Sequence, residues 1–317
     1  MDPYGPVPRI EWSWTNDRLL TCHAGRLRMF DAEGTAVRDV GAGRYLDARW
    51  LDGGGLLAMT SLGLAERFTM HGESYGEPLP VGPLRFTHAS LDARAERALL
   101  IATHGALSVT LTSVERRTVW QFREYRYNVQ SEIGRTTAAL SEDGARVAIG
   151  TETRAWESGR ERIASGRGVL VIAIDDDETV DRFWYECARD EAPLRFAFDA
   201  GPRRRLAIAA PEREDGFGTL RLGAGEVYPR THRGGARAVA LDGRGLLAAF
   251  AYPTGVGERR LRVDYLVPKT KGPVVVEITD TLWLDPDCEP IALAFDRDSR
   301  RIACLAADGG VEVVPVP

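Results

Sequence analysis

The chain has 317 residues, 44% of them hydrophobic and 27% charged, so it can bury a large core and does not have the composition of a disordered segment. Its 41 Lys and Arg against 46 Asp and Glu give a formal net charge of −5, which weighs against nucleic acid as a general partner. Four scattered cysteines without a C-x-x-C pair, no signal-peptide pattern and no long apolar run lead us to expect free thiols, a cytoplasmic location and no membrane span.

In chain order, one pattern recurs: an apolar residue, a polar turn, a strand-like apolar segment and a third short strand. The turns are WTND (14–17), WLDG (50–53), LDAR (91–94), LSED (140–143), FDAG (198–201), LDGR (241–244) and FDRD (295–298). The segments that follow them are LLTC, LLAM, ALLIA, VAIG, LAIAA, LLAAF and IACLA. Seven units of about four short strands, with turns 36 to 58 residues apart, predict an all-β, seven-bladed β-propeller of four-stranded antiparallel blades.

Radial stacking explains such a repeat, because one four-stranded sheet cannot bury both of its apolar faces alone. We therefore expect a single domain over 1–317, closed by an outermost strand from residues 2–8, where Pro3, Pro6 and Pro8 fit only an edge. The aromatic residues Trp14, Trp50, Phe86, Phe198 and Phe295 are expected in the core. The expected blades are approximately 8–41, 42–82, 83–126, 127–190, 191–234, 235–286 and 287–317.

The segment FDRDSRRIACLAADGGVEVV (295–314) resembles the turn, second strand, Asp-Gly turn and third strand of the WD40-like propellers. LRMFD (27–31) stands where that family often carries Trp-Asp. The resemblance covers nearly the whole chain and implies a divergent, bacterial-type propeller. Since the chain has no Gly-His dipeptide and no third strand ending in Trp-Asp, the family's His–Asp–Ser–Trp hydrogen-bond network is not carried over.

Several catalytic patterns are missing from the sequence. There is no H-E-x-x-H metal motif and no Walker loop. SEDGARVA (141–148) lacks the aromatic residue and spacing of sialidase-like boxes, and DDDE (175–178) lacks a calcium-loop pattern, so we read it as a solvated turn. The innermost strands TAALS, RFAF, AVAL and IALAF are mostly apolar. We expect no enzyme, no metal and no cofactor.

Unequal connections between the second and third strands point to a binding face. These connections are short in units 1, 2, 3 and 7, but long and charged at 151–168, 210–218 and 252–260. In a propeller they share one face with the connections between blades. Arg side chains can form bidentate hydrogen bonds with carboxylates, and the combination of Trp and Arg is typical of binding hot spots. The expected partner-binding residues are Arg154, Trp156, Arg160, Arg162, Arg213, Arg259, Arg260 and Tyr125. A self-satisfied or disordered insertion at 151–168 is the competing interpretation.

The leading hypothesis is a non-enzymatic scaffold or adaptor that binds a partner protein through this face, within a multi-protein bacterial defence or signalling complex. One alternative is a propeller hydrolase or lyase that acts at the central channel, which a ring of His, Asp or Glu on the innermost strands would support. Another is a nucleic-acid-binding module in which Tyr125, Tyr127 or Trp156 stacks on bases.

Overall fold

The computed structural model describes residues 7–81, 86–102, 108–113, 118–123, 137–157, 160–174, 178–186, 194–199, 205–209, 217–221, 227–229, 236–252, 260–268 and 276–317. Within these ranges the chain forms 27 strands, arranged as six four-stranded sheets and one three-stranded sheet. Strands that are consecutive in sequence pair antiparallel in each sheet. The prediction of an all-β propeller with antiparallel four-stranded blades is confirmed.

We number the sheets in chain order. Sheet 1 contains β1 (Arg9–Trp12), β2 (Arg18–His23), β3 (Arg26–Asp31) and β4 (Ala36–Val40). Sheet 2 contains β5 (Tyr45–Trp50), β6 (Leu56–Thr60), β7 (Leu64–Phe68) and β8 (Leu79–Pro80). Sheet 3 contains β9 (Phe86–Leu91), β10 (Arg97–Ala102), β11 (Ser108–Ser113) and β12 (Thr118–Arg123). Sheet 4 contains β13 (Thr137–Leu140), β14 (Arg146–Glu157), β15 (Arg160–Ala173) and β16 (Glu178–Glu186).

Sheet 5 contains β17 (Arg195–Phe198), β18 (Arg205–Ala209), β19 (Phe217–Arg221) and β20 (Val227–Pro229). Sheet 6 contains β21 (Ala238–Leu241), β22 (Leu247–Ala251), β23 (Leu261–Pro268) and β24 (Val276–Leu284). Sheet 7 contains β25 (Pro290–Phe295), β26 (Arg301–Ala306) and β27 (Val311–Pro315).

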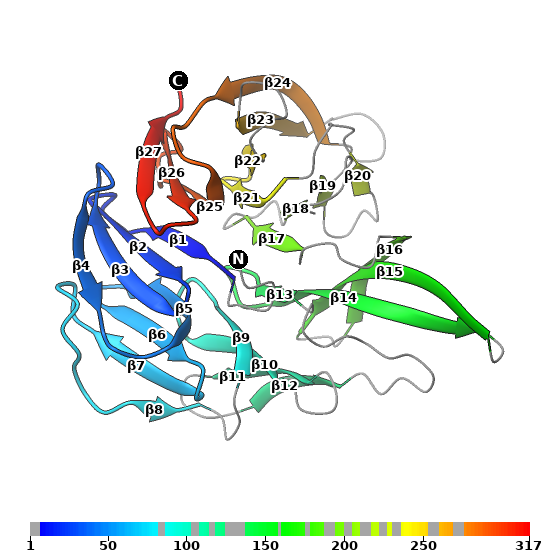
Figure 1. The fold of residues 1–317 in the computed structure, drawn as a ribbon, viewed down its shortest axis with the longest axis horizontal. Helices are drawn as coiled ribbons and strands as arrows, with labels where there is room; N and C mark the ends of the chain where they lie inside the picture. The colour runs from blue at the N-terminus through cyan, green and yellow to red at the C-terminus, as the bar shows by residue number, and fades with distance from the viewer. Residues whose placement is uncertain are drawn as a thin grey trace.

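The sheets form a closed ring, and the first strand of each sheet lies innermost (Figure 1). Each of these innermost strands contacts the innermost strand of the next sheet, and β25 of sheet 7 contacts β1 of sheet 1. Seven hydrophobic clusters fill the spaces between successive sheets. Apolar packing between successive sheets therefore contributes to holding the ring together.

The closing contact joins the two ends of the chain. Ile10 and Trp12 of β1 pack with Ile291 and Leu305 of sheet 7, and the Trp12 indole N–H donates to the Ala294 carbonyl at 3.1 Å. A closing strand from residues 2–8 was expected. Residues 1–6 lie outside the described residues, and residues 7 and 8 precede β1 without belonging to a strand.

The turn between the first and second strands repeats in detail. In sheets 3, 6 and 7 an Asp accepts from the backbone N–H groups four and five residues later; for Asp242 these donors are Leu246 at 2.6 Å and Leu247 at 2.8 Å. Ser13 makes the same pair of contacts in sheet 1. The first unit thus begins at Trp12-Ser13, two residues earlier than predicted. Trp14 is 39% exposed, so its expected core position is wrong, whereas Trp12 is 7% exposed.

Arginines that begin second strands connect neighbouring turns. The Arg97 guanidinium donates to the Gly144 carbonyl at 2.8 Å, and that of Arg205 donates to the Gly245 carbonyl. Arg301 donates to the Asn16 carbonyl at 3.0 Å and lies 4.4 Å from the centre of the Trp12 ring. The repeated turn and its Arg therefore link the sheets along one face of the ring.

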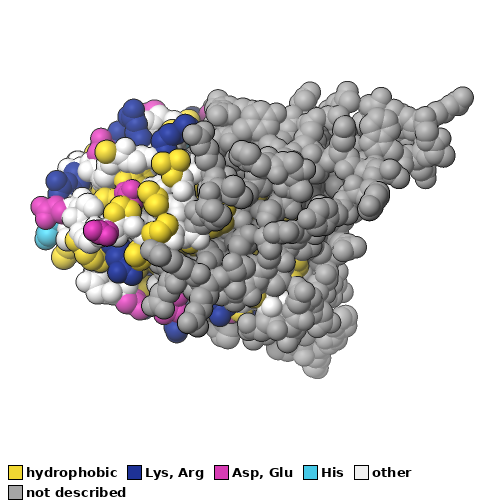
Figure 2. All heavy atoms as spheres, turned by 90° about the horizontal axis from the view of Figure 1, so that it is seen from below, with side chains coloured by type: hydrophobic (Ala, Val, Ile, Leu, Met, Phe, Trp, Pro, Cys, Tyr) yellow, Lys and Arg dark blue, Asp and Glu magenta, His cyan; other side chains and the backbone are white. Residues whose placement is uncertain are grey.

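The described surface mixes side chains of different kinds. Figure 2 shows hydrophobic side chains gathered between basic and acidic ones on the part of the surface that the structure describes. Among all the described residues, the exposed large hydrophobic ones are Trp14, Val37, Leu62, Met70 and Tyr75. They are spread over different turns and an outer strand of the first two sheets. In the described ranges, no helix is long and apolar enough to cross a membrane.

Candidate functional site

The segment 151–168, expected to be a loop, is instead the outer part of a β-hairpin. β14 has 12 residues and β15 has 14, whereas the second strands of the other sheets have five or six. Pairing continues from Arg146↔Ala173 out to Glu157↔Arg160, with one irregularity between Ala155 and Glu157. The loop assignment was wrong because hairpin pairing, not an irregular connection, accommodates the extra residues.

The hairpin extends beyond its own sheet. β13 pairs with β14 only as far as Gly150, and β16 pairs with β15 only as far as Gly166. Residues 154–157 and 160–165, which we call the arm, therefore pair in the structure only with each other. At about 3.3 Å per residue, the arm reaches roughly 20 Å past the last β13 pair. Figure 1 shows it projecting away from the ring.

The arm contains four of the eight predicted partner-binding residues. Arg154 and Trp156 lie on β14, and Arg160 and Arg162 lie on β15. Arg213, Arg259 and Tyr125 lie outside the described residues. Arg260 directly precedes β23, and its guanidinium donates to the Asp287 carbonyl at 2.8 Å, in the connection between β24 and β25.

A second polar group, not predicted from the sequence, occupies the innermost strands of sheets 1 to 3. Arg9 and Glu11 lie on β1, Asp47 and Arg49 on β5, and His88 on β9. Asp47 is 2% exposed, Arg49 5% and His88 6%. The expectation of mostly apolar innermost strands is therefore wrong for this side of the ring. It was based on the last four units alone.

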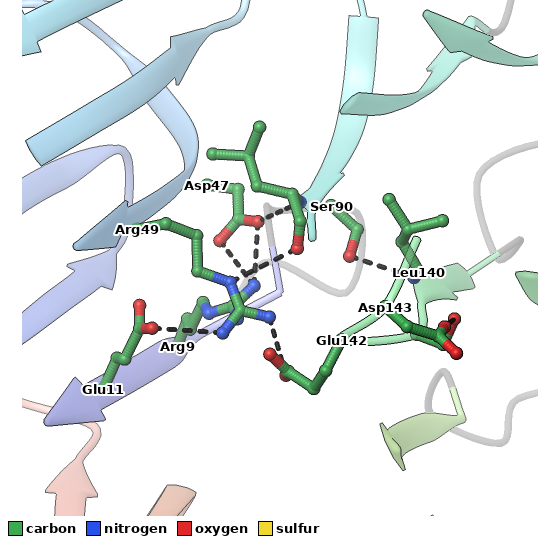
Figure 3. Close-up of polar contacts among 10 residues, drawn as sticks. Arg9, Glu11, Asp47, Arg49, Ser90, Leu140, Glu142 and Asp143 are labelled. Atoms are coloured by element: carbon green, nitrogen blue, oxygen red, sulfur yellow. Dashed lines mark hydrogen bonds and ion pairs between the residues drawn. The ribbon is translucent and has the colours of Figure 1, made fainter. Parts of the chain in front are cut away.

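Arg49 lies at the centre of this group (Figure 3). Its Nε donates to the Leu91 carbonyl at 3.2 Å, Nη1 to Glu11 at 3.1 Å and Nη2 to Glu142 at 2.7 Å. These partners belong to sheets 3, 1 and 4, and Arg49 itself belongs to sheet 2. One guanidinium thus connects four consecutive sheets.

A second ion pair lies beside it. Arg9 Nη1 donates to both carboxylate oxygens of Asp47, at 3.0 and 2.8 Å, and Asp47 Oδ2 also accepts from the Leu91 backbone N–H at 2.7 Å. Two positive and three negative side chains therefore share this buried region. We call Arg9, Glu11, Asp47, Arg49 and Glu142 the inner ion network.

Burial dominates the electrostatics of Glu11. It raises the pKa of the Glu11 carboxyl above its ordinary value, although the charges of Arg49 and Arg9 act in the opposite direction. Only one Glu11 oxygen has a partner, and Oε2 is buried without a hydrogen bond within the described structure. Glu11 is the least well compensated charge in the inner ion network.

Two further basic side chains, His88 and Arg195, lie beyond the network. Burial and, secondarily, the charge of Arg195 lower the pKa of His88 to about 4, so this imidazole is neutral at pH 7. Burial also lowers the pKa of Arg195 on β17 to about 10, and its Nε is buried without a hydrogen bond to any described group. Arg195 stays charged at neutral pH.

The arrangement favours a structural role for the inner ion network. Each of its carboxylates contacts at least one guanidinium, and the network joins separate sheets rather than surrounding one open position. Among the described residues, no group of three or more His, Cys, Asp or Glu side chains could hold a metal ion. What the geometry supplies is a closed ring of sheets from which the arm of sheet 4 projects.

Comparison with known proteins identifies the fold. No protein-family model matches the sequence, and no curated protein matches it. Among solved structures, the chain is similar to one in the mitotic checkpoint complex, with TM-score 0.64 and 12% identity over 100% of this chain and 90% of that one. It is also similar to the β-propeller domain of Cps50 (Swd1) from Myceliophteria thermophila, with TM-score 0.59 and 13% identity over 99% and 98% of the two chains.

A third similar structure is the hydrazine synthase of Kuenenia stuttgartiensis, with TM-score 0.62 and 14% identity over 100% of this chain and 97% of that one. One of the three therefore bears the name of an enzyme, and identities this low identify a fold rather than an activity. The closed ring and these similarities agree that the chain has a β-propeller fold.

Proposed function

We propose that this chain is a non-enzymatic scaffold or adaptor, a seven-bladed propeller that binds a partner protein through the face carrying the arm. In this proposal each of the seven sheets is one blade of a single domain over 1–317. The expected blade limits support that division, because each expected range contains one sheet. Arg154, Trp156, Arg160, Arg162, Arg213, Arg259, Arg260 and Tyr125 form the proposed docking surface.

The arm is the observation that carries the proposal. An isolated two-stranded hairpin is at best marginally stable in water, and no described sheet pairs with the arm. The ring therefore gains no sheet pairing from the arm's residues. Its free strand edges and its Arg-rich sequence are features that a partner protein can use, through added backbone pairing and contacts to carboxylates.

The position of Arg260 supports the proposal that this face binds the partner. Its contact with the Asp287 carbonyl places the start of β23 beside the connection between sheets 6 and 7. The backbone N–H of Tyr45, which follows the connection between sheets 1 and 2, likewise donates to the Gly25 carbonyl at 3.0 Å in the turn before β3. Connections between second and third strands thus share a face with connections between sheets, and the arm continues such a connection in sheet 4.

The inner ion network argues against a reaction at the channel, because its charged groups are already committed to one another. The partner is proposed to be a protein that presents acidic side chains, within a multi-protein defence or signalling complex of a bacterial cytoplasm. The similar chain in the mitotic checkpoint complex supports a protein partner in general.

The experiment is affinity capture from the native host with a trimmed variant. Replacing residues 154–165 with Asn-Gly keeps the Thr153↔Gly166 pair and closes it with a two-residue hairpin turn. The matched control is Arg244→Glu, because Arg244 is exposed in a turn between first and second strands, away from the arm. We expect a specific partner to bind the wild type and the control but not the trimmed variant. Equal capture by the trimmed variant would contradict the proposal.

A further inference from the structure

Cys288 and Cys304 are 16 positions apart in sequence, but the fold brings them together. Cys304 lies in β26, opposite Glu312 of β27. Cys288 lies in the connection 285–289, between β24 and β25. The two cysteines belong to the same hydrophobic cluster, between sheets 6 and 7. The absence of a C-x-x-C motif concealed this pair, because the contact depends on the closing of the last sheet.

Glu312 fixes the position of Cys288. Its Oε1 accepts from the Asp287 backbone N–H at 3.0 Å, and its Oε2 accepts from the Cys288 backbone N–H at 2.9 Å. Glu312 is also the cross-strand partner of Cys304. One carboxylate therefore holds the Cys288 backbone above the strand pair that carries Cys304.

The two thiols are in hydrogen-bonding contact but differ in environment. The hydrogen bond with Cys288, followed by burial, raises the pKa of the Cys304 thiol well above its ordinary value. Cys304 is buried, whereas Cys288 is only partly buried. Cys288 is thus the thiol that a dissolved oxidant reaches first, and Cys304 is the neighbouring thiol that can react with it next.

We propose that Cys288 and Cys304 form a redox-active dithiol, which a peroxide converts to an intramolecular disulfide. The Cys288 thiol loses its proton, and its sulfur attacks one peroxide oxygen, which gives a sulfenic acid and releases water. The Cys304 sulfur then attacks the Cys288 sulfur, an S–S bond forms, and the sulfenic oxygen leaves as a second water with the Cys304 proton. The two sulfurs together lose two electrons, and hydrogen peroxide is reduced to two molecules of water.

The disulfide would restrain the connection 285–289, which also contacts two arginines that precede strands of sheet 6. Arg260 donates to the Asp287 carbonyl, and Arg237 forms an ion pair with Glu289. Oxidation at Cys288 therefore ties β26 covalently to a connection that two arginines of sheet 6 also hold. This inference does not depend on the proposed function.

Peptide mapping after peroxide treatment tests the dithiol. Trypsin releases Cys288 in peptide 272–297 and Cys304 in peptide 302–317. After hydrogen peroxide treatment of the full chain and alkylation of remaining thiols, we expect these peptides to be joined and lighter by two hydrogen atoms than their sum. Cys22 is the internal control, because it is buried in β2 and should stay reduced until it is alkylated in denaturant. Alkylated Cys288 and Cys304, or a link from either to peptide 183–189 with Cys187, would overturn the proposal.

Two variants test the order of the steps. Cys304→Ser should stop at the Cys288 sulfenic acid, which dimedone traps, whereas Cys288→Ser should leave Cys304 as a thiol. Dimedone labelling of Cys304 in the Cys288→Ser variant would contradict the assigned order. Amide hydrogen exchange measured on the wild type needs no substitution. The amides of 285–289 should exchange more slowly after oxidation, and a reductant should restore their original exchange rates. Unchanged exchange would refute the restraint.

Discussion

Replacing Arg49 with Met tests how strongly the inner ion network holds the ring. Met keeps an unbranched apolar side chain in the buried position but removes every hydrogen bond of the guanidinium. Arg9 is then the one remaining positive charge that acts on Glu11 among the described groups, and Glu142 loses its 2.7 Å partner. The Leu91 carbonyl also loses a donor.

The expected cost is large because buried charges are left uncompensated. Removing one partner of a buried ion pair costs about 3–5 kcal/mol, whereas an exposed pair contributes at most about 1 kcal/mol. The Arg49 side chain is 6% exposed, and those of Glu11 and Glu142 are 20% and 23% exposed, so we expect a loss of about 3 kcal/mol.

The loss should also depend on pH. The folded-state pKa of Glu11 is already raised, and removal of Arg49 raises it further. Between its unfolded and folded pKa values the folded protein binds more protons than the unfolded chain, so the free energy of unfolding falls as pH rises through that interval. The deficit of the variant should therefore be larger at pH 8 than at pH 5.

Urea unfolding followed by tryptophan fluorescence measures this loss at both pH values. The control is Arg28→Met, since Arg28 pairs with Asp39 at 2.8 Å but the two side chains are 33% and 67% exposed. We expect the control to lose less than about 1 kcal/mol. If Arg49→Met costs no more than Arg28→Met at pH 8, the network does not hold the sheets together and the reasoning is refuted.

Two further predictions concern His88 and ring closure. The pKa of His88 is about 4 in the folded protein against an ordinary 6.5, so the unfolded chain binds the proton first and stability should fall by roughly 3 kcal/mol as pH drops from 6.5 to 4. His88→Gln should flatten this dependence in urea titrations, and an unchanged slope would show that His88 is not its source. Gly34 and Gly53 both have positive φ, but a Cβ at Gly34 would lie 2.7 Å from the Val311 carbonyl oxygen of sheet 7, whereas one at Gly53 meets nothing within 4 Å. Gly34→Ala should therefore lower the free energy of unfolding by about 1–3 kcal/mol more than Gly53→Ala does. Urea unfolding measures both variants, and equal midpoint urea concentrations would mean that the closing contact does not constrain this turn.

The repeat made the fold predictable from the sequence. Its polar turns follow from a specific contact, an Asp or Ser that accepts from backbone N–H groups four or five residues later. The first unit was displaced because Ser13 replaces Asp there and two Trp residues stand close together. The position of each Trp relative to the turn residue Ser13 distinguishes the buried Trp12 from the exposed Trp14. Taking the aromatic residue nearest to the polar turn as the start of the unit gives the wrong one.

The inner ion network could also have been found from the sequence once that register was known. Two residues before the turn residue, the seven units have Glu11, Arg49, Ser90, Ala139, Ala197, Ala240 and Ala294. Four residues before it they have Arg9, Asp47, His88, Thr137, Arg195, Ala238 and Ala292. Charged residues at equivalent positions of neighbouring sheets predict ion pairs between those sheets. The aligned Ala residues predict close apolar packing on the other side.

The arm and the cysteine pair were less accessible to sequence reasoning. An insertion rich in Arg, Glu and Gly has no apolar alternation, which is the pattern that distinguishes a strand from a loop in a sequence. The Cys288–Cys304 contact requires a short connection to fold back over β26, and the spacing of the cysteines does not encode that geometry.

Site-specific photo-crosslinking tests the central claim most directly, namely that the arm contacts a partner protein. A benzophenone amino acid is placed at position 162 on the arm or at position 244 on an exposed turn away from it, and the native host is irradiated. The account predicts a discrete protein adduct from position 162 and none from position 244. Adducts from position 244 alone, or no adduct from position 162 while the protein is found in a complex, would contradict it.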